Sequence, residues 1–194
     1  MGHLILTMHV SADGYIAQPD GGLWPDFGWP PVVQGRLNEV YQGAGLVLYG
    51  RGIYEAVVPW WSAVARGGAP SGVEVGKEGE QFARLLAALP KAVVSSIMPE
   101  PGDGTRVIRD DVVRQVTELV DAEAKDVILL AGGRLTSELL AAGLVQDIVL
   151  IVGTVLIGAG RPLLEDLAGQ VPLTLVEAVA FPPTTSWLRY RVSQ

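Results

Sequence analysis

The chain has 194 residues, 49% of them hydrophobic. This length and apolar content suit the core of one compact α/β domain spanning residues 1–194. Its 14 Lys and Arg against 21 Asp and Glu give a net charge of −7, which would repel a nucleic-acid backbone, so we expect no nucleic-acid partner. With no Cys and only two His, the sequence excludes disulfides, a thiol nucleophile and the usual structural zinc site, and we expect no metal.

The chain carries no pattern for secretion or for a membrane span. The first ten residues lack the basic start and long apolar stretch of a secretory signal. The longest uncharged run, residues 148–160, is shorter than the roughly 20 residues that a membrane helix needs. We therefore expect a cytoplasmic protein that does not bind membranes.

Apolar runs alternate with helical patterns from the start of the chain. Residues 4–10 form an apolar run that ends in Ser-Ala-Asp-Gly, which is typical of a strand buried on both faces. Residues 18–31 are rich in Gly, Pro and aromatic side chains and predict a long loop. A helix is predicted at 32–41 and a second buried strand at 46–49.

The alternation continues into the second half. A helix is expected from about residue 53, followed by a Gly-rich loop at 65–79. Asp110 and Asp111 suit a helix N-terminus, by capping and by the helix dipole. The further elements expected are helices at 82–89, 112–120 and 135–140 and strands at 91–94, 105–108 and 127–131. Strands alternating with helices favour a parallel sheet covered on both faces.

The last third of the chain has a different pattern. Residues 148–157, 172–180 and 185–192 are three extended runs, and only four residues separate the last two. So short a connection allows antiparallel strands but no crossover. Arg189 and Arg191 alternate with apolar residues, so the last strand is expected at or near an edge. The predicted fold is a three-layer α/β/α with a mostly parallel central sheet and antiparallel C-terminal strands.

Small or polar residues follow three of the predicted parallel strands, at Gly50-Arg51-Gly52, Ser95-Ser96 and Gly132-Gly133-Arg134. Ligands of open α/β sheets bind outside the carboxyl ends of the strands, so we expect the three turns to lie side by side at a ligand site. The Gly pair would let a phosphate approach free N–H groups at a helix start, and the Arg51 guanidinium would pair with a second phosphate. The alternatives are a plain tight turn and an exposed Arg.

Several segments resemble the successive motifs of the dihydrofolate-reductase-like superfamily. They are residues 8–17 (MHVSADGYIA), residues 48–55 (LYGRGIYE) and the Ala-Gly-Gly of 131–133 before a helix. Residues 143–148 and 155–164 are similar to the branch related to the C-terminal reductase domain of the bacterial riboflavin-biosynthesis deaminase/reductase. The resemblance covers nearly the whole chain with its motifs in the right order.

The resemblance implies NADPH as the hydride donor. The end of the first strand, with Ile16, would border the nicotinamide, and the Gly-Arg-Gly turn would lie near cofactor phosphates. The Ser pair would lie beside the adenosine 2′-phosphate, and the helix start after the second Gly turn against the pyrophosphate. The implied cofactor-binding residues are Met8, His9, Val10, Ser11, Ile16, Gly50, Arg51, Gly52, Ser95, Ser96, Gly132, Gly133, Arg134, Leu135 and Thr136.

Two departures from the family pattern leave the substrate open. Dihydrofolate reductases keep a carboxylate on the helix after the long loop, where this chain has WPPVVQ at 29–34, and Asp26 is the nearest acid. Riboflavin-pathway reductases usually carry a paired Asp-Pro motif after the second strand, where this chain has IYEAVVPWW at 53–61. Asp13 and Asp26 are the catalytic candidates, for proton relay or substrate hydrogen bonding, although Asp in Asp-Gly is also a common turn residue.

The function that these observations favour is NADPH-dependent reduction of a small heterocycle, most similar to that of a 5-amino-6-(5-phosphoribosylamino)uracil reductase. The alternatives are a dihydrofolate or pterin reductase, a non-catalytic NADP-binding protein on the same scaffold, and a homodimeric interaction module. Trp24, Trp29, Trp60 and Trp61 would either wall a flat ring or serve packing. The apolar C-terminal strands and a mean hydropathy of +0.34 predict a homodimer.

Overall fold

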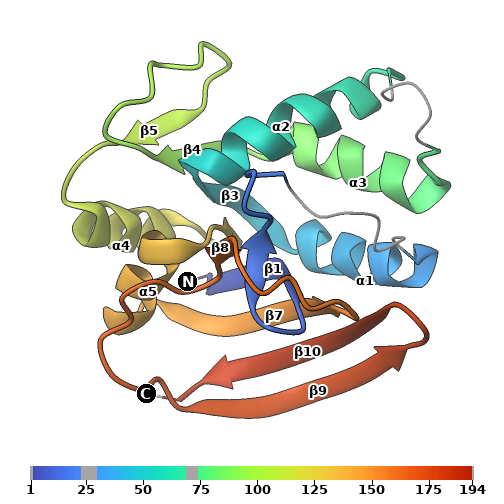
Figure 1. Ribbon diagram of the computed structural model, residues 1–194. Coiled ribbons are helices and arrows are strands. Elements are labelled where there is room, and N and C mark those ends of the chain that lie inside the picture. The colour runs from blue at the N-terminus through green and yellow to red at the C-terminus, as the bar shows by residue number, and fades with distance from the viewer. Residues whose placement is uncertain (1, 23–29, 69–73, 194) are drawn as a thin grey trace.

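A computed structural model describes residues 2–22, 30–68 and 74–193. An eight-stranded sheet in the order β5-β4-β3-β6-β1-β7-β10-β9 forms its centre (Figure 1). The strands of this sheet are β1 Leu4–Ser11, β3 Ala44–Gly50, β4 Lys91–Val94, β5 Arg106–Ile108, β6 Asp126–Leu130, β7 Val145–Gly153, β9 Leu173–Phe181 and β10 Thr185–Val192. The helices are α1 Pro31–Gln42, α2 Arg51–Ala65, α3 Lys77–Ala88, α4 Val112–Ala122 and α5 Gly133–Ala141.

The sheet is parallel from β5 to β7 and antiparallel beyond it. β1 pairs in parallel with both β6 and β7, and β3 with both β4 and β6. β10 pairs antiparallel with β7 on one side and with β9 on the other. The predicted mostly parallel sheet with antiparallel C-terminal strands is therefore confirmed, and β10 lies one strand in from the edge.

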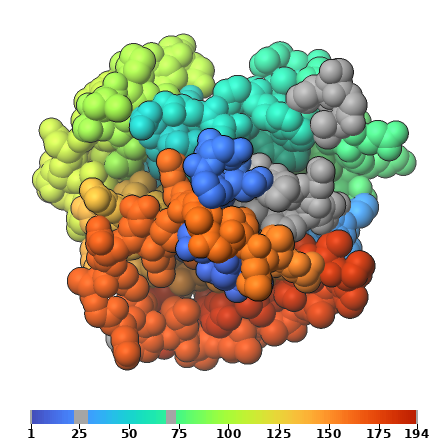
Figure 2. All heavy atoms as spheres, in the orientation of Figure 1, coloured from blue at the N-terminus to red at the C-terminus, as the bar shows by residue number. Residues whose placement is uncertain are grey.

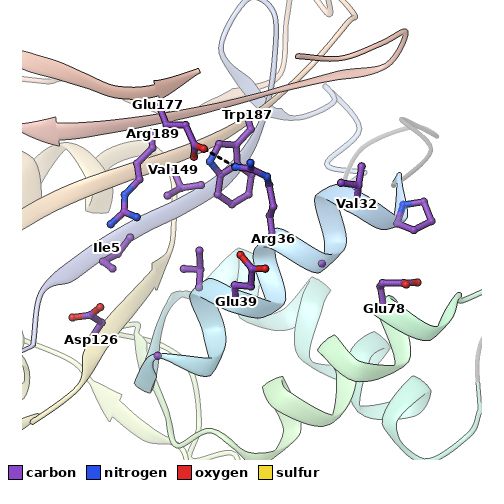
Figure 3. A pocket seen from close by; sticks show the side chains of 14 residues that line it. Ile5, Val32, Arg36, Glu39, Glu78, Asp126, Val149, Glu177, Trp187 and Arg189 are labelled. Carbon is purple, nitrogen blue, oxygen red and sulfur yellow. Dashed lines mark hydrogen bonds and ion pairs between the residues drawn. The ribbon is translucent and has the colours of Figure 1, made fainter. Parts of the chain in front are cut away.

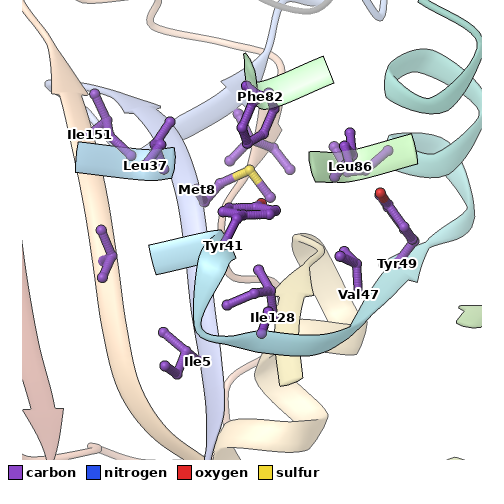
Figure 4. Packing of buried hydrophobic residues seen from close by; sticks show 14 of the residues in the cluster. Ile5, Met8, Leu37, Tyr41, Val47, Tyr49, Phe82, Leu86, Ile128 and Ile151 are labelled. Atoms are coloured by element: carbon purple, nitrogen blue, oxygen red, sulfur yellow. The ribbon is translucent and has the colours of Figure 1, made fainter. Parts of the chain in front are cut away.

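Helices cover both faces of the sheet, in a three-layer arrangement (Figure 1). On one face, Leu37 and Tyr41 of α1 and Phe82 of α3 are buried in a core with the sheet (Figure 4). On the other face, Val116 of α4 and Leu139 of α5 are buried in a second core. These side chains recur at helical spacing, which is why the helices were predictable. Within the described ranges, no helix is long and apolar enough to cross a membrane.

A second, two-stranded sheet was not predicted. β2, Tyr15–Ala17, pairs antiparallel with β8, Arg161–Pro162. The pairing brings the segment after β1 together with the segment after β7, and the blue and orange stretches lie against each other on the surface shown in Figure 2. We call residues 157–165 the strap. The strap crosses the carboxyl ends of the parallel strands, where its Leu163 N–H donates to the Gly14 carbonyl at 2.9 Å and its Leu163 carbonyl accepts from Gly133 at the start of α5.

Two local expectations were wrong. Residues 148–157 are not one extended strand, because β7 begins earlier, at Val145, and ends at Gly153. The helix α4 starts where Asp110 and Asp111 predicted, but no side-chain cap hydrogen bond forms. Asp111 has a left-handed backbone with φ of 44° and its carboxylate pairs with Arg114 instead. Attraction between opposite charges one turn apart therefore replaces the cap.

Candidate functional site

The three turns singled out in the sequence lie at the ends of three consecutive strands. β4, β3 and β6 are neighbours in the sheet, with Gly50 opposite Val94 and Tyr49 opposite Leu130. Their carboxyl ends therefore bring Ser95, Gly50 and Gly132 to one edge, as predicted. β1 is the next strand after β6, so Ser11 borders the same edge.

The helix α2 starts at this edge with its amide groups uncapped. Gly50 is the N-cap residue, no side chain caps the helix, and its first turn carries no acid. Arg51 is exposed, and its Nη1 lies 3.3 Å from both carboxylate oxygens of Glu55. The first N–H groups of a helix carry partial positive charge and attract anions. This helix start is therefore a place where an anionic group would be stabilised.

The helix α5 starts at the same edge, but its first amide is already bonded. The Gly133 N–H donates to the Leu163 carbonyl at 2.9 Å, so this amide is not one of the free N–H groups of the helix start. The Glu165 carboxylate lies 3.3–3.4 Å from the position that a Gly133 Cβ would take. Arg134 pairs with Asp166 at 3.4 Å. Charges of the protein itself therefore occupy the beginning of α5.

Other parts of the chain fill the space that the glycines of this edge leave. The Ile16 side chain lies where a Cβ of Gly132 would be, well inside contact distance. Nη1 of Arg161 lies 2.5 Å from the position that a Cβ of Gly52 would take. A Cβ on Gly50 would lie 3.4 Å from the Cβ of Ala131. The glycines therefore allow β2 and the strap to lie directly on the strand ends.

Asp13 ties the end of β1 to the strap. Its carboxylate accepts hydrogen bonds from the Ser11 hydroxyl at 2.6 Å and from the backbone N–H groups of Ile157 and Gly158, the latter at 2.7 Å. These bonds stabilise the ionised carboxylate, the Ser11 bond most of all, and hold the Asp13 pKa below its usual value. A carboxylate in this state accepts hydrogen bonds and is a poor proton donor at neutral pH.

The side chains implied for the nicotinamide border form an apolar wall at the end of β1. Met8, Val10 and Ile16 are buried. His9 lies between Met8 and Val10 along the strand, and burial lowers its pKa to about 3, so the imidazole is neutral at neutral pH. The Ser11 hydroxyl donates to Asp13 and accepts from the Tyr15 N–H, so both of its bonds serve the turn.

The Ser pair divides into one engaged and one exposed hydroxyl. Ser95 is buried and its Oγ accepts from the Met98 N–H at 3.0 Å, which closes the turn after β4. Ser96 is exposed. Ser96 is therefore better placed than Ser95 for contact with a ligand in solution.

Two further predicted residues lie in the first turn of α5. Leu135 is half-buried and Thr136 is buried, and the Thr136 hydroxyl has no hydrogen-bond partner within the described residues.

A groove of about 820 Å³ runs along α1 on the side of the C-terminal strands (Figure 3). Arg36 crosses it from α1, with Nη1 2.9 Å from Oε1 of Glu177 on β9. The Arg36 guanidinium also lies 5.8 Å from the centre of the Trp187 ring, a cation–π distance. The buried Trp187 Nε1 has no hydrogen-bond partner within the described residues. Sequence reasoning missed this groove, because it joins helix and strand residues about 150 positions apart.

Some of the predicted residues are not described by the structure. Asp26, Trp24 and Trp29 lie outside the described residues. Trp60 and Trp61 are described and pack edge to face, with ring centres 4.4 Å apart, and Trp61 packs on Phe82 at 4.8 Å. The packing role considered for this Trp pair is therefore the one observed. No group of three or more His, Asp or Glu side chains suited to a metal ion occurs in the part of the chain described.

The sheet order and the helix layers on both faces define a dihydrofolate-reductase-like α/β fold. The sequence model of the RibD C-terminal domain family matches residues 2–186, so the chain belongs to this family.

Three comparisons accompany this assignment. An uncharacterized protein of Bacillus subtilis, YyaP, is 25% identical over 183 residues, 92% of this chain and 88% of that protein. A putative riboflavin biosynthesis protein from Shewanella matches with a TM-score of 0.74 at 18% identity, over 99% of each chain. A dihydrofolate reductase from Enterococcus faecalis, solved with NADP(H), matches with a TM-score of 0.64 at 14% identity, over 100% of this chain and 98% of that one.

Proposed function

We propose that this protein is an NADPH-dependent reductase of a small heterocyclic substrate, of the 5-amino-6-(5-phosphoribosylamino)uracil reductase type. The observation that supports it most is the single edge formed by the ends of β4, β3 and β6, where α2 begins with uncapped amides. Membership in the RibD C-terminal domain family and the fold shared with an NADP(H)-bound dihydrofolate reductase point the same way. Ligands of open α/β sheets bind at this edge.

The residues at the edge fit a dinucleotide by their chemistry. The first amides of α2 and Arg51 suit an anionic phosphate, and the exposed Ser96 hydroxyl suits the 2′-phosphate that distinguishes NADPH from NADH. The buried side chains at the end of β1, Met8, Val10 and Ile16, are apolar, which suits a nicotinamide ring next to this strand end. NADPH, when bound, supplies the hydride. The protein's part is to hold the ring face-on to the acceptor and to exclude water.

The proton that accompanies the hydride needs a donor. Asp13 and Asp26 are the candidates from the sequence. Asp13 is ionised and engaged with Ser11 and the strap, so we assign it to anchoring. Asp26 remains our candidate for proton delivery or substrate hydrogen bonding, and an Asp26→Asn variant should lose kcat with little change in the Kd for NADPH.

The proposed function is tested by binding and then by turnover. Titration of the protein with NADPH, followed by nucleotide fluorescence, should show saturable binding; absence of binding would leave an interaction module as the alternative. Addition of 5-amino-6-(5-phosphoribosylamino)uracil or of dihydrofolate should then deplete the NADPH absorbance with one of the two. Binding without oxidation by either class of heterocycle would contradict a reductase and favour a non-catalytic nucleotide-binding protein.

We also propose that two copies associate through β9. β9 is the last strand of the sheet and pairs only with β10 within the described residues. Its Leu173, Leu175 and Val176 are 44%, 56% and 53% exposed, and a long apolar edge strand invites pairing with another chain. Sedimentation should give a dimer, and Leu175→Lys with Val176→Lys should shift it to a monomer. A wild-type protein that sediments as a monomer would contradict this.

A further inference from the structure

We propose that Arg161 is a phosphate-binding residue: its guanidinium holds the pyrophosphate of the dinucleotide against the first turn of α2. This inference rests on the proposed NADPH site and assigns a role within it to a residue on the strap. The sequence pattern gave no reason to select Arg161, because it follows no parallel strand and lies in a Gly-rich stretch.

The first observation is the position of the guanidinium. Nη1 of Arg161 lies 2.5 Å from where a Cβ of Gly52 would be, and Gly52 is the second residue of α2. The absence of a side chain at position 52 therefore lets the guanidinium lie directly on the helix start. β8 also lies beside α5, since the Pro162 carbonyl is 3.6 Å from the missing Cβ of Gly132. Arg161 is thus at the ends of β3 and β6, where a pyrophosphate would lie, and not at the Ser turn after β4.

The second observation is that the charge of Arg161 is not neutralised. Arg51 pairs with Glu55, and Arg134 pairs with Asp166. In the described chain, Arg161 makes neither an ion pair nor a side-chain hydrogen bond, although it stands beside the positive end of α2. A cation at that end is repelled by the helix dipole, and within the described residues no side-chain cap accepts from the first amides of the helix. An anion between the guanidinium and the amides would satisfy both.

The third observation is that the start of α5, the other helix start at this edge, is less suited to a phosphate than the start of α2. The Gly133 N–H donates to Leu163, and the Glu165 carboxylate already lies at that helix start. A second anion there would be repelled by Glu165 and would have to displace the Leu163 bond. The start of α2 carries no acid in its first turn. Electrostatics therefore favour the α2 side for the phosphates, and Arg161 is the free cation on that side in the described chain.

The strap fixes the backbone that carries Arg161. On the N-terminal side, Asp13 accepts from the N–H groups of Ile157 and Gly158. At the residue itself, β8 pairs with β2, with Arg161 opposite Ala17. On the C-terminal side, Leu163 bonds both Gly14 and Gly133. A backbone held on both sides limits the entropy lost when the guanidinium binds an anion.

The experiment measures dissociation constants of NADPH and NADH for the full chain and for three variants. Arg161→Ala should weaken both nucleotides by the same factor, about ten- to a hundredfold, because both carry the pyrophosphate and the lost bond is charge-assisted. Arg161→Lys should keep part of the affinity, because it retains the charge without the planar fork. Arg84→Ala is the matched control. It removes one cation from α3, where Arg84 pairs with Glu80, and should leave both constants unchanged.

Thermal unfolding without nucleotide separates a binding role from a structural one. Arg161→Ala should unfold at the wild-type temperature or slightly above it, because a repelled cation is removed from a helix start. A lower unfolding temperature would contradict the inference, as would unchanged binding or a loss confined to NADPH. If the wild type binds neither nucleotide, the proposed function itself fails; if it binds both and Arg161→Ala binds equally well, only the role of Arg161 fails.

Discussion

The side chain of Ile16 fills the space that a side chain at position 132 would need. An ideal Cβ on Gly132 would overlap Cδ1 of Ile16 and lie 3.3 Å from its Cγ1. Gly132 has φ of −150° and ψ of −176°, an extended conformation open to any residue. The requirement for glycine here is therefore one of space, and it allows β2 to close over the end of β6.

A double-mutant cycle tests this relationship. Gly132→Ala should lower the free energy of unfolding by about 1–3 kcal/mol, because Ile16 must leave its rotamer or move β2. Ile16→Val alone should cost about 0.5–1.5 kcal/mol. Because Val lacks the overlapping Cδ1, the double variant should be less destabilised than the sum by about 1 kcal/mol. Denaturant unfolding of the four proteins measures the coupling, and strict additivity would show that the two side chains do not compete for this space.

The anchoring role of Asp13 predicts a local effect on the strap. In Asp13→Asn the amide retains one acceptor oxygen and turns an NH2 group towards N–H donors, so the bonds to Ile157 and Gly158 should weaken. Hydrogen exchange at these two amides should become faster than in the wild type. Asp20→Asn is the control, because it changes an exposed Asp that, among the described residues, accepts from the Gly22 N–H of its own turn.

The pKa of Asp13 sets the pH range of that effect. Because the folded pKa is lowered, the stabilisation is fully present above the ordinary carboxyl pKa and is lost as the pH falls through the lowered folded value. Protection of Ile157 and Gly158 should therefore survive mild acid in the wild type. If Asp13→Asn instead abolished turnover while exchange in the strap stayed unchanged, Asp13 would be a proton relay, as its place in the sequence motif suggests.

Burial of His9 predicts a loss of stability in acid. Its pKa falls from 6.5 to about 3 on folding, so between these pH values the imidazole is protonated in the unfolded chain and neutral in the folded chain. The folded state therefore loses stability as the pH drops from about 6.5 towards 3, by up to about 1.4 kcal/mol per pH unit. His9→Gln should flatten this slope in urea unfolding, whereas His3→Gln, at the exposed His, should retain it. Equal slopes in the wild type and His9→Gln would refute the prediction.

Elements defined by contacts between residues close in the sequence could be predicted, and those defined by contacts between distant residues could not. Helix α4 and strands β1 and β6 were predictable because their apolar residues recur at local spacings. The meeting of three turns at one edge followed from the rule for parallel sheets. The strap was not predictable, because Asp13 reaches a partner 145 positions away and β8 has only two residues. Arg161 owes its place entirely to that long-range pairing.

The two hydroxyls after β4 predict how nucleotide preference can be changed. The Ser95 hydroxyl accepts from the Met98 N–H and closes the turn, so replacement of Ser95 would disturb the loop. Ser96 is exposed, so it can be replaced without loss of this hydrogen bond. Ser96→Asp places a negative charge where we propose the 2′-phosphate, and like charges brought together at an interface cost several kcal/mol. We expect the preference for NADPH over NADH to fall by about tenfold or more, with binding of NADH nearly unchanged. Ser96→Asn, of similar size but neutral, is the matched control and should retain most of the preference. A proportional loss of both nucleotides in Ser96→Asp would place the adenosine 2′-phosphate elsewhere on the edge.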